Sequence, residues 1–148
     1  MRAFDVIRDK FSKPDTITSP EITKNNLYAA IKRNPENIRL IRNPSEDLQL
    51  LAVSTIAASL IHIINPTEKV KVTAINKLPS VIISMSYSDK LHVITRHDLN
   101  ECKHNIVKHL LTLIKDSEFF ELKEMLDILN KYKLKWPELL IIQNSLKN

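Results

Sequence analysis

The residues best suited to chemistry gather in the segment RHDLNECKHNIVKH, which contains the single cysteine of the chain, Cys102, together with His97, His104 and His109. Thiolate and imidazole groups are typical zinc ligands. Structural zinc sites, however, usually pair two closely spaced cysteines, or two histidines with a second ligand pair, and Cys102 has no cysteine partner. On one helix Cys102 and His109 would share a face while His104 points elsewhere. We therefore predict no metal and no cofactor, with Cys102 buried and the histidines exposed.

The same segment raises the possibility of catalysis. Cys102 beside a histidine has the composition of a thiolate pair, and Glu121 and Glu124 further along the chain are potential acids or bases. Nothing in their spacing separates these residues from ordinary polar residues on the solvated face of a helix. We therefore predict that the protein is not an enzyme.

The densest basic feature consists of Lys32, Arg33, Arg39 and Arg42. Helical-repeat proteins can hold a phosphate backbone on such a surface, so nucleic acid is one possible partner. Two observations weigh against it. Glu36 lies in the middle of the cluster, and only 5% of the residues are aromatic and available for stacking on bases.

The absence of glycine argues against several classes of protein. None of the 148 residues is glycine. The Rossmann fingerprint, the Walker A loop and the nucleophile elbow all need glycine for positive φ angles or close backbone approach, so these three enzyme classes are disfavoured. Tight β-hairpins are disfavoured as well, whereas helices joined by Pro- and Asn-containing turns do not need glycine.

Composition and length indicate one soluble domain spanning residues 1–148. The chain is 43% hydrophobic and 26% charged, with a net charge of +5. A single cysteine fits a reducing compartment, and the N-terminus lacks the apolar segment of a signal peptide. The longest apolar run, LLAVSTIAASLIHII, is too short and too rich in Ser and Thr to span a membrane. We therefore expect a cytoplasmic protein without a membrane partner.

A repeat of 22 residues organises the first half of the chain. Residues 22–43, 44–65 and 66–87 align without gaps, and small or branched residues then fall into the same columns. The matching columns are Ala30, Ala52 and Ala74; Ile31, Val53 and Ile75; Ile38, Leu60 and Ile82; and Ile41, Ile63 and Met85. A small residue repeated beside a branched one indicates a close approach of two helices.

Each copy reads as two short helices. Asn43 and Asn65 are good N-caps, each is followed by proline, and a glutamate follows three residues later, as in a capping box. The second helix of each copy is expected to begin at Pro35, Ala57 or Pro79. Units this short cannot each enclose a core, so neighbouring copies must cover their apolar faces, as in a helical solenoid.

The ends of the chain follow different patterns. Residues 1–18 suit an N-terminal capping helix and linker, and residues 19–87 hold the three two-helix repeats. Residues 88–148 contain a decayed copy and three longer helices, which together form a C-terminal helical cap. We expect these helices to run from Asp98 to about Lys115, from Ser117 onward, and from Pro137 onward.

The repeat also points to an apolar surface. Where the first copy has Arg39 and Arg42, the second has Ile61 and Ile64, and the third has Ile83 and Ser86. Such helices are either covered by the C-terminal helices or form a hydrophobic strip, edged by Arg39, Arg42 and Lys77, that accepts a partner helix or a second protomer. The sequence leaves both alternatives open.

The units, of the form NPSEDLQLLAV followed by NP, resemble the short HEAT-like tandem helical repeats found in proteins of tailed bacteriophages and some bacteria. The resemblance covers roughly residues 20–87. It implies an all-α solenoid with a binding or scaffolding surface, in a bacterial or phage-infected cytoplasm. The sequence hypothesis is therefore a non-catalytic protein-binding module, such as a phage-encoded inhibitor that occludes a site on a host protein. The alternative is nucleic-acid binding through Lys32 to Arg42.

Overall fold

The computed structural model describes residues 24–88 and 93–146, and every element in these two ranges is a helix. The all-α prediction is therefore confirmed for this part of the chain. The N-terminal cap predicted for residues 1–18 lies outside the described residues. None of the described helices has the length and apolar character needed to cross a membrane.

Most helices fall into two rows along the molecule. Helices of the first row contact one another in chain order, and so do those of the second row. The first row consists of α2 (Lys24–Arg33), α3 (Glu46–Thr55), α4 (Glu68–Lys77) and α6 (Arg96–Glu101). The second row consists of the 3-10 helices η2 (Pro35–Leu40) and η3 (Ala57–His62), then α5 (Val81–Tyr87) and α8 (Phe119–Lys131).

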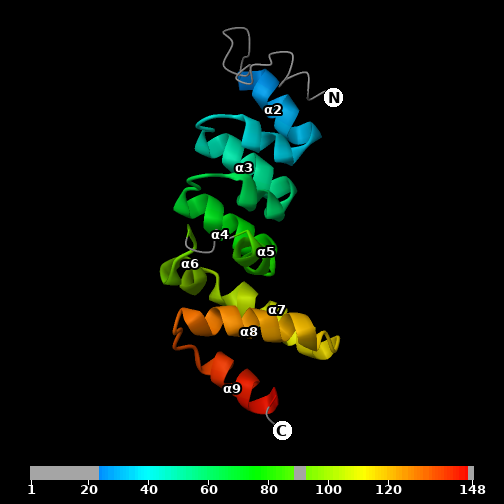
Figure 1. Cartoon of the computed structure of the whole chain (residues 1–148), viewed down its shortest axis with the longest axis vertical. Helices are drawn as coiled ribbons and strands as arrows, with labels where there is room; N and C mark the ends of the chain where they lie inside the picture. Colours follow the sequence, from blue (N-terminus) through cyan, green and yellow to red (C-terminus); the bar gives the residue numbers. More distant parts are fainter. Residues whose placement is uncertain (1–23, 89–92, 147–148) are drawn as a thin grey trace.

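Two further helices complete the C-terminal end. Helix α7 (Lys103–Lys115) continues from α6 and packs against α4 and α8, and α9 (Pro137–Leu146) closes the chain. Figure 1 shows the resulting elongated stack, with α2 at one end and α9 at the other. The first and the last described helices therefore lie at opposite ends of the long axis.

The columns predicted from the 22-residue period form the core. Ala52, Ala74, Val53 and Ile75 are completely buried, and Ile31 is buried beside them. In the second row, Leu60 and Ile82 are equally buried. One continuous hydrophobic cluster runs from α2 to α9. Small side chains at the helix contacts let the backbones approach closely, as the sequence predicted.

The helix starts differ from the predicted capping boxes. Ser45 and Thr67 are the N-caps of α3 and α4, and their hydroxyls accept hydrogen bonds from the backbone N–H groups of Leu48 and Val70 at 3.3 Å. The predicted capping role of Asn43 and Asn65 is therefore wrong. The two prolines precede the helices in extended loops, which places each hydroxyl within reach of the third helical N–H.

The second-row elements also differ from expectation. Helices η2 and η3 begin at Pro35 and Ala57 as predicted, but each is a six-residue 3-10 helix. The tighter i→i+3 pattern suits such short pieces. The buried Asn37 side chain holds η2 against the end of α2 by donating a hydrogen bond to the carbonyl of Ala30 at 2.8 Å. In the third copy α5 is a true α-helix and begins at Val81, two residues after Pro79.

The single helix predicted from Asp98 to about Lys115 is two helices. The backbone leaves the helical conformation at Cys102, whose N–H donates to the carbonyls of Asp98 and Leu99. Helix α8 begins at Phe119 rather than Ser117, because Ser117 has a positive φ of 59°. The predicted start of α9 at Pro137 is confirmed.

A buried polar network joins α4 to α6. The Asp98 carboxylate, 1% exposed, lies 3.0 Å from the Lys71 ammonium and accepts a hydrogen bond from the Thr95 N–H at 2.9 Å. The ammonium of Lys71 and the hydroxyl of Tyr132 also donate to the carbonyls of Val93 and Ile94. The chain segment before α6 is therefore fixed by three side chains.

Candidate functional site

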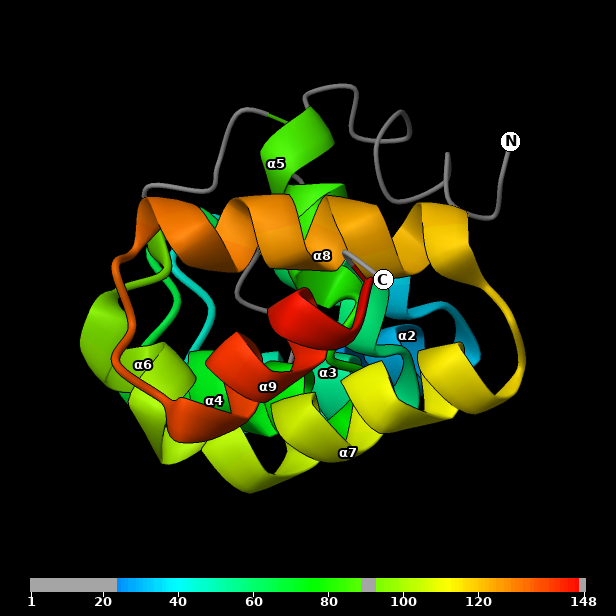
Figure 2. The same cartoon turned by 90° about the horizontal axis from the view of Figure 1, so that it is seen from below.

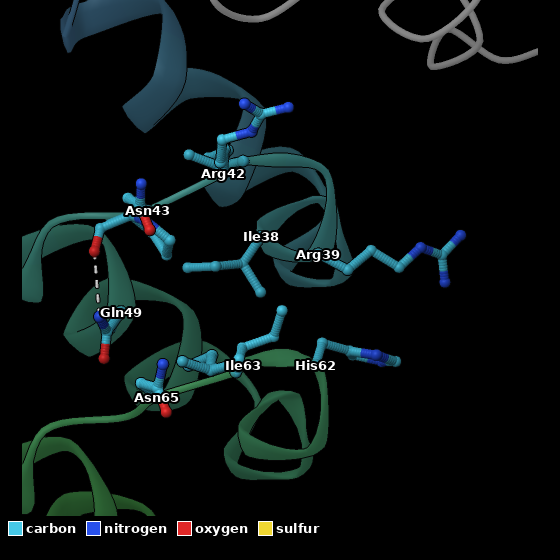
Figure 3. A pocket seen from close by; sticks show the side chains of 11 residues that line it. Ile38, Arg39, Arg42, Asn43, Gln49, His62, Ile63 and Asn65 are labelled. Atoms are coloured by element: carbon cyan, nitrogen blue, oxygen red, sulfur yellow. Dashed lines mark hydrogen bonds between the residues drawn. The ribbon is translucent and has the colours of Figure 1, made fainter. Parts of the chain in front are cut away.

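A pocket of about 230 Å³ opens where the first and second copies end. Figure 3 shows Ile38 and Ile63 between Arg39 and His62 on one side and Asn43 and Asn65 on the other. Eleven residues line the pocket: Ile38, Arg39, Ile41, Arg42, Asn43, Pro44, Gln49, His62, Ile63, Ile64 and Asn65. They come from the ends of η2 and η3 and from the two loops that follow.

Two loops at the same position of successive copies build the pocket walls. Each 3-10 helix ends at an isoleucine in extended conformation, Ile41 or Ile63, whose N–H donates to the carbonyl three residues back. Asn43 has a φ of 140°, an unusual value for a residue other than glycine. This backbone turn sends the chain from the second row back to the first and leaves the asparagine exposed at the pocket edge.

The buried amide of Gln49 supports the loops from below. Its Nε2 donates to the carbonyl of Pro44 at 3.0 Å, and its Oε1 accepts from the N–H of Thr67 at 3.4 Å. The Thr67 hydroxyl in turn donates to the Glu46 carboxylate at 2.6 Å. Gln49 therefore connects the loop of one copy to the helix start of the next, and fixes the distance between the pocket walls.

The pocket combines positive charge with apolar surface. None of the eleven described lining residues is acidic, and four are isoleucines. The Arg39 guanidinium lies 3.6 Å from the Glu36 carboxylate, but both side chains are more than half exposed, so this pair contributes little. Arg42 has no carboxylate partner within the described ranges. The surface suits a partner that offers a carboxylate beside an apolar side chain.

The structure brings together three of the seven predicted site residues. Arg39, Arg42 and Ile64 line the pocket, and Ile64 is 77% exposed. Lys32 and Arg33 are exposed in the last turn of α2, outside the pocket lining.

The remaining two predicted residues, Ile61 and Ile83, lie on η3 and α5 and are less exposed than Ile64. Ile61 and Ile83 are half-buried and pack against the core. Helix α8 contacts α5, the helix that carries Ile83, whereas the neighbours of η3, which carries Ile61, include η2, α3, α4 and α5. Lys77, predicted at the edge of the strip, is exposed at the end of α4 and does not line the pocket.

Sequence reasoning missed the polar part of the pocket. Asn43 and Asn65 were interpreted as helix caps, which assigned their side chains to the backbone. Their recurrence at the 22-residue period was the signal that both occupy the same place in successive copies. His62 gave no such signal, because its column holds Leu40 in the first copy and Ser84 in the third.

The possible metal ligands separate in space. His97 lies 2.8 Å from Glu68, and His109 lies 3.0 Å from Glu121 on α8. His104 is exposed, and Cys102 is buried. Among the described residues, no three histidine, cysteine or acidic side chains are grouped so that they could hold a metal ion.

Cys102 is poorly suited to nucleophilic chemistry. Burial, assisted by the negative charges of Asp98 and Glu101, raises the pKa of its thiol to about 12. The thiol lies 3.6 Å from the carbonyl of Val72, to which it donates a weak hydrogen bond. A thiol that stays protonated at neutral pH is a poor nucleophile and a poor metal ligand.

The two glutamates considered as acids or bases make contacts between helices. Glu121 faces His109, and Glu124 accepts a hydrogen bond from the Tyr87 hydroxyl. That hydrogen bond raises the pKa of Tyr87 above its ordinary value. Both glutamates therefore connect α8 to neighbouring helices.

Comparisons with family models, with curated proteins and with solved structures found no match to this chain.

Proposed function

We propose that this chain is a HEAT-like helical-repeat module whose function is non-catalytic protein binding. The loops at the same position of successive copies, after η2 and η3, and the shared burial of the 22-residue columns support the repeat relation. The high pKa of the Cys102 thiol supports the absence of cysteine catalysis.

One observation carries the binding proposal: two arginines and an exposed isoleucine line the same pocket between the first two copies. Ile64 exposes an apolar side chain that a partner can cover, and Arg39 and Arg42 orient that partner through its carboxylates. An arginine can hold a carboxylate by two parallel hydrogen bonds, which adds geometric specificity.

The partner we propose is a protein segment with an acidic residue next to an apolar one. Binding in the pocket would place the elongated stack of helices over the surface of that partner and exclude other molecules sterically. The proposed setting, a phage-encoded inhibitor of a host protein in the bacterial cytoplasm, comes only from the resemblance of the repeats. A second protomer is also an acceptable partner in chemical terms.

Nucleic acid is the second candidate, because four basic residues lie on neighbouring helices. Arg39 and Arg42 line the pocket at the end of η2, and Lys32 and Arg33 are exposed at the end of α2, which contacts η2. The two candidates differ in salt dependence. A protein that neutralises four phosphates loses affinity on the order of a hundredfold between roughly 50 and 200 mM salt. An apolar protein interface changes little over this range.

The test is a pull-down from nuclease-treated bacterial lysate at low and high salt, with four forms of the protein. They are the wild type, Arg39→Glu/Arg42→Glu, Ile64→Asp, and the matched control Lys32→Glu/Arg33→Glu, which reverses two charges outside the pocket. We expect one protein to be retained at high salt by the wild type and by the control. Both pocket variants should lose it.

Two results would overturn the proposal. Retention of the same protein by both pocket variants would remove the pocket from the interface. Loss of all binding after nuclease treatment, with equal weakening by the two charge-reversed variants, would favour nucleic acid as the partner.

A further inference from the structure

A second surface lies at the opposite end of the molecule, on α7. No acidic residue occurs between Lys103 and Lys115, and the helix has a buried face and an exposed face. Ile106, Leu110 and Leu113 are buried. The exposed residues of the helix are His104, Lys108, Leu111, Thr112 and Lys115, and their spacing places them on one face. One face of α7 is therefore basic with an apolar residue at its centre.

A groove runs between this face of α7 and the start of α9. It is lined by Lys103, His104, Val107, Lys108, Leu111 and Glu138 and has a volume of about 360 Å³. Figure 2, viewed from the C-terminal end, shows α9 over the end of the stack with α7 beside it. Val107 and Leu111 supply the apolar part of the groove, and the 53% exposure of Leu111 leaves its side chain open to a partner.

The two lysines that line the groove differ in their contacts. At one end Lys103 lies 3.2 Å from the Glu138 carboxylate, and the Lys103 ammonium also lies 6.0 Å from the centre of the Trp136 ring. These contacts occupy Lys103. No carboxylate pairs with Lys108 within the described ranges, so its ammonium is available to an acidic partner.

The exposed part of α9 extends the apolar surface. Leu140 and Ile141 are 61% and 65% exposed, although Leu139 and Ile142 beside them are buried in the core. The terminal helix of a helical stack normally presents a polar outer face, because no neighbour covers it. The exposed face of α9 is apolar at Leu140 and Ile141, near Glu138 of the groove lining, and polar at Asn144 and Ser145.

We propose that the groove between α7 and α9 binds an amphipathic α-helix of a partner protein, with acidic residues along one flank. Apolar residues of that helix would cover Val107 and Leu111, and a carboxylate would face Lys108. A concave groove with an apolar base accepts a helix, whereas a membrane surface cannot enter it. The charge of the rim selects an acidic helix over a basic one.

The inference is independent of the pocket at Arg39 and Arg42, and it is tested on the full chain. The probe is a fluorescent helical peptide with leucines spaced as i, i+3, i+4 and i+7 and glutamates on both sides. A second peptide carries lysines in place of the glutamates. We expect the acidic peptide to raise the fluorescence anisotropy in a saturable manner and the basic peptide to have no effect.

Variants locate the binding. Lys108→Glu and Leu111→Ser change exposed residues and should each weaken binding about tenfold. The matched control is Lys123→Glu, a charge reversal at an exposed residue of α8. This variant and Arg39→Glu/Arg42→Glu should bind the acidic peptide as the wild type does. That expectation holds whether or not the pocket at Arg39 and Arg42 binds a partner.

Three results would overturn the inference. They are no saturable binding of the acidic peptide, equal binding of both peptides, or equal weakening by Lys108→Glu and the Lys123→Glu control. Vesicles of anionic lipid provide the last comparison. Cosedimentation that is lost in Leu111→Ser, without any peptide binding, would assign the surface to a membrane instead.

Discussion

At the scale of single residues, surroundings determine what Cys102 can do. In the sequence it lies among histidines, which made a thiolate pair worth considering. In the folded chain its neighbours are the carbonyl of Val72, thirty residues earlier, and the carboxylates of Asp98 and Glu101. Burial and these negative charges favour the protonated thiol. Sequence spacing predicted the burial of Cys102 but not the partners that decide its pKa.

The raised pKa of Cys102 predicts both its reactivity and a dependence of stability on pH. The thiol loses its proton near pH 9 in the unfolded chain and near pH 12 when folded. Between these values the unfolded state binds fewer protons, so the stability contributed by this thiol falls as pH rises. The native protein should resist iodoacetamide at pH 8, whereas the urea-unfolded chain should react.

Urea denaturation at several pH values tests the linkage. Cys102→Ala should show a shallower fall of the unfolding free energy between pH 9 and 12 than the wild type. Tyr87 and Tyr132, whose pKa values are also raised, remain in both proteins and act in the same direction. Parallel curves for the two proteins would contradict the assigned pKa.

At the scale of elements, the connection into α6 depends on one buried ion pair. Lys71→Met should leave the buried Asp98 carboxylate without its cation and lower the unfolding free energy by about 3 kcal/mol. Lys71 is 14% exposed, so water cannot replace the lost ammonium easily. The measurement is urea denaturation followed by circular dichroism.

The control for this prediction is Lys123→Met. Lys123 pairs with Asp127 at 3.1 Å, but the side chains are 76% and 60% exposed. Removing such a surface pair should change the unfolding free energy by no more than about 0.5 kcal/mol. Similar small losses in both variants would show that the Lys71–Asp98 pair does not hold α6 in place.

Sequence patterns were sufficient to predict where helices lie and which faces they bury. Periodic apolar residues located α7, α8 and α9, and the 22-residue columns identified the buried faces of α3 and α4. Boundaries were less predictable. Asn, Ser and Thr are all good caps, and the choice between Asn43 and Ser45 depends on backbone angles that no local pattern specifies.

At the scale of the whole molecule, α4 occupies the centre of the stack and α9 lies at its end. Helix α4 contacts α3 and η3 on one side and α6 and α7 on the other. In a linear array, stability is shared mainly between neighbours, so the ends open before the centre. We expect backbone amides in α4 to exchange hydrogen at least about tenfold more slowly than those in α9.

Hydrogen exchange followed by mass spectrometry of proteolytic fragments would measure this difference. Equal exchange in α4 and α9 would mean that the chain opens as one cooperative unit, and the array description would then be wrong.

The candidate pocket was only partly predictable, because its lining comes from two loops 22 residues apart. The sequence placed Arg39 and Arg42 at the edge of a possible apolar strip that includes Ile64, and these three residues line the pocket. The contact of α8 with α5, which carries Ile83, follows from long-range packing and is not encoded in a single copy.

The two loops that precede α3 and α4 have nearly the same backbone angles at Ser45 and Thr67, −68° and 162° against −72° and 164°. The two helix starts therefore share one backbone conformation, although Asn43 has a positive φ and Asn65 does not. We expect duplication or loss of the residues from Ser45 to Pro66 to join two helix starts of the same local conformation. Each copy gained or lost in this way would change the distance between the pocket and the α7 and α9 groove by the length of one repeat.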